Sequence, residues 1–126
     1  MIAYCTLGTR DMTRATAFYD ALLAELGAKR VLEWDRMVAW GNAPGAPMLS
    51  VVLPYDGQEA TAGNGTMVAL SVGSPDVARR MHAKALEMGG SDEGAPGWRG
   101  DPGGFYGAYF RDLDGNKLCV YGFGIQ

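Results

Sequence analysis

The sequence predicts an α+β fold made of two copies of one βαβββ module, and three observations support that prediction. The chain aligns with itself at an offset of 63 residues, half of its 126, so that Leu23 meets Leu86 and Gly27 meets Gly90. Each half opens with a strand-like run that leads into a segment with helical spacing of apolar residues. The rest of each half consists of strand-like runs separated by turn residues. Together these features indicate a cryptic duplication.

The first copy, module one, spans about residues 1–57. Its helix is expected at 12–26, because Asp11 is suited to cap the first turn and Gly27 to end the last one. Apolar residues recur along this segment at helical spacing, at Ala15, Phe18, Leu22 and Leu26. The strands of module one are expected at 2–8, 30–35, 37–41 and 48–53.

The second copy, module two, spans about residues 64–126. Its helix is expected at 75–88, since Ser74 can cap it and Pro75 fits a first position that needs no amide hydrogen. Gly89 and Gly90 terminate that helix. The strands are expected at 66–72, 105–111 and 117–123, with a short polar sixth strand at 91–94, and a glycine-rich linker at 57–65 joins the modules.

Composition places limits on the function. A chain of 126 residues is the size of one domain, here taken as 1–126. The formal net charge is −3, and the basic residues are scattered, so a nucleic-acid partner is not expected. The longest apolar run, 51–53, is far too short for a membrane span, and a cytoplasmic protein is the expectation. Cys5 and Cys119 form no CxxC motif and are expected to be free thiols.

The two ends of the chain resemble the vicinal oxygen chelate superfamily, which includes glyoxalase I, extradiol dioxygenases and bleomycin-resistance proteins. The resemblance lies in RDLDGNKLCVY at 111–121 and in IAYCTLGTRDM followed by ATAFYDALLAELG near the start. In the first of these, Asp114-Gly115-Asn116 is typical of a tight turn, with Gly and Asn supplying positive φ. The resemblance implies that each module curls its mixed sheet into a half-barrel with the helix on the outer face. It also implies a ligand inside the curl and a homodimer.

The metal site that the resemblance implies is degenerate. Relatives with a metal use His or Glu side chains, and the matching positions here hold Tyr4, Met67 and Cys119, with Ser50 as the only polar group near the fourth position. These groups are not the imidazole and carboxylate set that such metals take. The only histidine, His82, falls within the second helix, where a surface or half-buried structural role is expected. We therefore expect neither a metal nor another cofactor.

Strand alternation, started from the presumed ligand positions, predicts the residues that line the cavity. They are Tyr4, Thr6, Met67, Ala69, Ser71, Cys119 and Tyr121. Cys119 has two interpretations. It is a soft side chain that lines the pocket, or a nucleophile for which only Lys117 is a local activator. Cys5 is expected to face the core.

A glycine- and proline-rich segment at 94–104 is predicted to be an irregular loop with Trp98 and Arg99 at its centre. One interpretation is a lid over the binding site, to which Trp98 gives apolar cover and Arg99 a charge. The other is a solvated connection whose tryptophan packs on the rim of the sheet. Farther back, a two-residue turn at 35–36 predicts that Trp34 and Trp40 lie on opposite faces of their hairpin.

The function predicted from these residues is small-molecule binding of the glyoxalase or bleomycin-resistance type, with a small organic ligand held in the cavity. A first alternative is a glyoxalase-like lyase or transferase that uses an atypical metal set, Cys119 or Tyr121. A second alternative is a dimeric interaction module whose cavity is vestigial.

Overall fold

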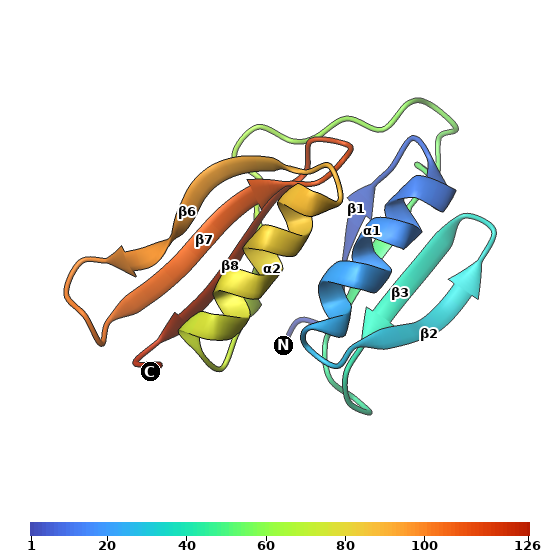
Figure 1. Ribbon diagram of the computed structural model, residues 1–126. Helices are drawn as coiled ribbons and strands as arrows, with labels where there is room; N and C mark the ends of the chain where they lie inside the picture. The colour runs from blue at the N-terminus through green and yellow to red at the C-terminus, as the bar shows by residue number, and fades with distance from the viewer.

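The computed structural model describes all residues, 1–126, and confirms the predicted α+β class. The chain forms two four-stranded sheets with one helix on each, and neither sheet closes into a barrel (Figure 1). The first sheet has the order β1-β4-β3-β2 and the second β5-β8-β7-β6, so the same topology occurs twice. In each, the first strand runs parallel to its neighbour and the other pairs are antiparallel. The bounds are β1 Tyr4–Gly8, α1 Met12–Ala24, β2 Lys29–Trp34, β3 Met37–Gly41, β4 Met48–Val52, β5 Val68–Ser71, α2 Pro75–Glu87, β6 Ser91–Arg99, β7 Phe105–Arg111 and β8 Lys117–Phe123.

Both helices begin where the capping residues predicted. The Asp11 side chain accepts a hydrogen bond from the Arg14 amide, and the Ser74 hydroxyl accepts one from the Val77 amide. Helix α1 ends two residues earlier than expected, at Ala24. The chain then leaves through a turn that closes at Gly27 with φ 69°, a conformation that favours glycine.

The helices lie side by side on the same side of the two sheets, and they contact each other (Figure 1). The core lies between the helices and this side of the sheets. Its largest fully buried side chains are Trp40, Tyr19, Phe18, Phe110, Leu22 and Met81. Because side chains alternate along a strand, every second strand residue points to the opposite side, which we call the open face. Neither helix is long and apolar enough to cross a membrane.

The last turn of the fold joins the modules. Asp112 Oδ2 accepts a hydrogen bond from the Tyr19 hydroxyl at 2.6 Å, and Asp114 Oδ2 accepts one from the Thr9 hydroxyl at 2.7 Å. The amide of Asn116 donates from Nδ2 to the Gly8 carbonyl at 2.9 Å. We call this set of contacts the clasp. Within the turn, Gly115 has the expected positive φ, but Asn116 does not; its side chain instead bonds across to module one.

The prediction of an irregular loop at 94–104 is wrong. Strand β6 runs as far as Arg99, which leaves residues 100–104 as the connection to β7. Two register shifts, at 92–94 and 94–97, absorb the glycines and Pro96 within this strand. Strand β6 is also the edge strand of its sheet. Pro96 has no amide hydrogen, and an edge strand tolerates such a residue because it has no second neighbouring strand to bond. An edge strand with bulges therefore tolerates a composition that a central strand would not.

Candidate functional site on the open face

Three predicted site residues share the open face of module two. In the parallel pair of β5 and β8, Ser71 is the register partner of Tyr121, and Ala69 is the partner of Cys119. Their neighbours Leu70, Leu118 and Val120 pack in or against the core, so Ser71, Cys119 and Tyr121 point the other way. Met67 precedes β5 and is 43% exposed. By the same alternation it lies on this face.

Two further predicted residues occupy the open face of module one. Tyr4 and Thr6 alternate with Cys5 and Leu7, which pack with the core, and both are exposed. Thr6 is the register partner of Ser50 on β4. The Ser50 hydroxyl is fully buried, and it is the only buried side-chain polar atom without a hydrogen-bond partner.

The structure separates Trp98 from Arg99, which the lid prediction had placed together. Trp98 is the register partner of Tyr106, and their rings meet edge to face at 5.0 Å between centroids. Tyr106 belongs to the core cluster, so Trp98 packs toward the helices. Arg99 is the partner of Phe105 and lies on the open face. The structure therefore agrees with the interpretation in which Trp98 packs on the sheet.

An aromatic pair flanks these residues. The rings of Phe105 and Tyr121 stack with centroids 5.2 Å apart and an interplanar angle of 25°. Gly107 follows Phe105 by two residues on β7 and is the register partner of Tyr121 on β8. A Cβ at Gly107 would lie 2.6 Å from the ring of Phe105, so glycine is needed for this ring to lie over the strand.

Tyr109, the register partner of Cys119, is the centre of a cluster that the sequence interpretation missed. The guanidinium of Arg99 lies 5.5 Å from the centroid of its ring, and the ammonium of Lys117 lies 5.6 Å from it. Phe105 and Tyr109 escaped prediction because 105–110 has aromatic residues on both faces of β7. Its sequence therefore has no polar alternation to show which side chains point away from the core.

Electrostatics in this cluster keep both acidic groups neutral. Burial raises the pKa of the Cys119 thiol above its ordinary value, and the opposing effects of Tyr109, Arg99 and Lys117 are smaller. Burial also raises the pKa of the Tyr109 phenol, with an added contribution from Cys119. A neutral buried thiol is a poor nucleophile, because the thiolate is the reactive form.

The side chains at the presumed metal positions do not fit the metal that relatives hold. A phenol at Tyr4, a hydroxyl at Ser50, a thioether at Met67 and a neutral thiol at Cys119 offer no imidazole and no carboxylate. No three His, Cys, Asp or Glu side chains of the chain come together in an arrangement that could hold a metal ion.

Three other polar side chains, His82, Arg10 and Arg111, are engaged in contacts within the fold. His82 is buried, more than expected, and its Nε2 lies 2.9 Å from Oδ1 of Asp92. Arg10 forms ion pairs with Asp114 and Glu59. Arg111 pairs with Glu93. These contacts give His82, Arg10 and Arg111 structural roles within the fold.

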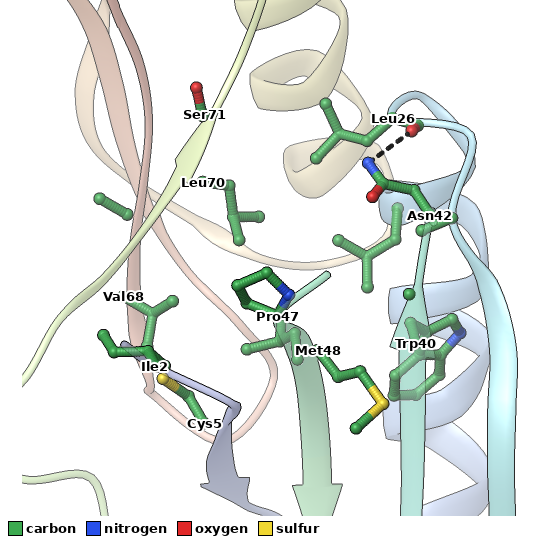
Figure 2. A pocket seen from close by; sticks show the side chains of 15 residues that line it. Ile2, Cys5, Leu26, Trp40, Asn42, Pro47, Met48, Val68, Leu70 and Ser71 are labelled. Carbon is green, nitrogen blue, oxygen red and sulfur yellow. Dashed lines mark hydrogen bonds between the residues drawn. The ribbon is translucent and has the colours of Figure 1, made fainter. Parts of the chain in front are cut away.

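An apolar hollow of about 380 Å³ lies where the two modules meet, and Figure 2 shows side chains that line it. Residues from β1, the end of α1 and β5 line it, and Ile2, Cys5 and Leu70 are among them. Its main polar group, the Asn42 amide, already donates to the Leu26 carbonyl at 3.3 Å. Of the residues predicted to line the cavity, only Ala69 and Ser71 border this hollow, which we call the junction groove.

A second hollow, of about 550 Å³, borders module two. The linker residues 62–66 form one wall, and Met67, Arg111 and Lys117 complete it. Met67 and Lys117 thus line a space beside the open face. Trp34 and Trp40 lie on opposite faces of their hairpin, as predicted: Trp40 is buried in the core, and Trp34 is 62% exposed on the open face.

Comparisons with known proteins agree with this architecture. Residues 1–120 match the family profile described as the glyoxalase/bleomycin resistance protein/dioxygenase superfamily. Among solved structures, a glyoxalase/bleomycin resistance protein from Albidiferax ferrireducens T118 is 33% identical, with a TM-score of 0.87 over 96% of this chain and 97% of that one. A hypothetical protein from S. aureus is 25% identical, with a TM-score of 0.72 over 96% and 91%.

More distant structures share the fold alone. The fosfomycin resistance protein FosX from Mesorhizobium loti is 15% identical, with a TM-score of 0.68 over 96% of this chain and 89% of that one. No curated protein sequence matches the chain.

Proposed function

The chain belongs to the glyoxalase/bleomycin resistance protein/dioxygenase superfamily, and we propose that it is a small-molecule-binding protein whose metal site is degenerate. The ligand lies on the open face, against Met67, Ser71 and Tyr121 of module two, and the buried side chain of Cys119 forms part of the wall behind them. Tyr4 and Thr6 of module one complete the site when a second copy of the chain covers this face. Sequestration of a ligand needs only such a cavity, so it survives the loss of metal ligands.

The observation that carries the proposal is the chemistry of the open face. It combines a stacked aromatic pair, a thioether, a hydroxyl and a neutral thiol with cationic groups at one side. Small-molecule sites are built in this way, from apolar and aromatic walls with a few polar groups that orient the ligand.

The junction groove is the rival location for a ligand in this chain. It has a suitable volume, but its Asn42 amide is already bonded and no charged side chain lines it. Its walls are apolar side chains at the meeting of two packed modules. Such a groove could take an apolar compound but has little with which to orient one, which favours the open face.

The glyoxalase-like alternative through Cys119 has less physical support. A nucleophilic thiol needs a lowered pKa, whereas burial raises the pKa of this one. No observation favours Tyr121 as a catalytic group, because its ring stacks on Phe105 and its hydroxyl donates no hydrogen bond to a base.

A thermal-shift screen of small acids, thioethers and aromatic compounds, with titration of the best hit, tests the proposal. Tyr121→Ala should weaken binding of that hit, because it removes half of the aromatic pair. Ile2→Trp, which fills the junction groove, should leave binding unchanged. The opposite pattern would place the ligand in the groove.

The degenerate metal site is tested on the same protein. Elemental analysis after dialysis should find well under one equivalent of Ni, Zn, Mn or Fe per chain. One equivalent that a chelator removes together with ligand binding would overturn this part of the proposal and favour the metal-dependent alternative.

A further inference from the structure

Two cationic side chains of the open face have no acidic partner. Six of the eleven Lys and Arg residues form ion pairs, but Arg99 and Lys117 do not. Both lie within 6 Å of the centroid of the same ring, that of Tyr109. Neither charge is neutralised within the chain, so an anion beside this ring would be attracted by both.

The backbone fixes the position of the Arg99 guanidinium. Nη1 donates to the carbonyl of Gly97 at 2.9 Å, and Nη2 donates to that of Ala95 at 2.7 Å. A guanidinium has five N–H donors, so others are left without a protein partner. The group is held in place and still has donors to offer, which reduces the entropy lost when a ligand binds.

Lys117 can be reached from outside. It is only partly buried, and it lines the hollow that linker residues 62–66 form beside the open face. The carboxylate of Glu93 pairs with Arg111, the register partner of Lys117, and no acidic side chain forms an ion pair with Lys117. The Cys119 thiol does not supply the missing negative charge either, because burial keeps it protonated.

We propose that Arg99, Lys117 and Tyr109 form a subsite for the anionic group of a small organic anion, whose apolar body lies against the stacked rings of Phe105 and Tyr121. This inference rests on the proposed function and deepens it, since it names the chemical class of the ligand. The anionic head group is a carboxylate or a phosphate ester, and both have oxygen atoms that a guanidinium and an ammonium recognise.

Matched pairs of probes test the subsite. Benzoate, phenylacetate and cinnamate are titrated by calorimetry and ligand-observed NMR beside their neutral amides, and phenyl phosphate serves as the phosphate-ester arm. The acids should bind at least about tenfold more tightly than the amides. Tight binding of phenyl phosphate, with weak binding of the carboxylates, would also support the anion subsite and assign a phosphate ester to it.

Single variants then test the residues. Arg99→Gln and Lys117→Gln should each weaken binding of the anionic probes by about tenfold to a hundredfold and leave binding of the amides unchanged. Arg80→Gln and Lys84→Gln remove the same charges from helix α2 and should have no effect on any probe. Unchanged melting temperatures and circular dichroism would show that the variants fold.

The outcomes separate this inference from the function on which it rests. Equal affinity for acids and amides, or no loss in either open-face variant, overturns the anion subsite. If neutral compounds bind in a Tyr121-dependent way while no anion does, the subsite is wrong and the proposed function stands. If no compound binds in a Tyr121-dependent way, both are wrong.

Discussion

At the scale of single residues, the environment of Cys119 decides what this thiol can do. It is 1% exposed and its pKa is raised, whereas Cys5 on the other face is only half-buried. The position at which metal-dependent relatives carry a carboxylate therefore holds a neutral, covered sulfur atom. Cys119 therefore acts as a small side chain in the wall of the ligand site, and the proposed function assigns it no catalytic role.

We predict that native Cys119 reacts slowly with iodoacetamide at neutral pH. Labelling of the Cys5→Ser protein should be slow at pH 7 and approach that of a free thiol in urea, while Cys119→Ser should label faster through Cys5. Mass spectrometry after timed quenching measures both rates. Rapid labelling of native Cys119 at pH 7 would indicate an activated thiol and revive the catalytic alternative.

The same pKa shift has a consequence for stability. A thiol whose pKa is raised in the folded state stabilises the fold below its ordinary value of about 8.5, and this contribution is lost as the pH rises through the folded pKa. The buried Tyr19 phenol also has a raised pKa, because of burial and then Asp112, so the direction is the same. Alkaline pH should therefore destabilise the protein.

At the scale of elements, the clasp shows how one turn holds two modules together. Asp112 accepts hydrogen bonds from the Tyr19 hydroxyl and from backbone amides of its own turn, and Asp114 bonds Thr9 and Arg10. The recognisable DLDGN segment is therefore structural in this chain. It connects the end of module two to the start of α1 in module one.

We predict that Tyr19→Phe lowers the free energy of unfolding by about 1.5–3 kcal/mol, the value of a hydrogen bond to a charged group. The buried carboxylate of Asp112 would lose one partner and keep its others. Urea denaturation measures the change, and Tyr55→Phe, at a tyrosine that is 92% exposed, is the matched control. A loss no larger than the control would mean that water replaces the phenol at Asp112.

The elements also show what sequence could predict and what it could not. Caps at Asp11 and Ser74 and a terminating Gly27 are local signals, and the helices begin where these signals indicated. The extent of β6 depends instead on pairing with β7, through bulges that no local pattern at 94–99 reveals. The same limit explains the site: Cys119 and Tyr121 follow from alternation, whereas Tyr109 is recognised only once Arg99 is seen to lie over it.

At the scale of the whole molecule, the open face is unlike the surface of a protein that stays alone. Four large apolar side chains lie on it and are 43% to 75% exposed, namely Tyr4, Trp34, Met67 and Phe123. In addition, β1 and β5 each pair with a strand on one side only, so each has a free edge. Exposed apolar faces and unpaired edges are typical of surfaces that a partner covers.

We predict that the protein is a homodimer in which the open faces cover each other. In such a symmetric contact each substitution occurs twice, so Tyr4→Glu or Trp34→Glu places two buried negative charges in the interface and should give monomers. Leu86→Glu is the matched control, because Leu86 is a large apolar residue exposed on α2, away from this face. Sedimentation velocity measures all four proteins. A monomeric wild type, or dissociation by Leu86→Glu alone, would contradict this arrangement. Each ligand site would then be formed by the open face of one chain only.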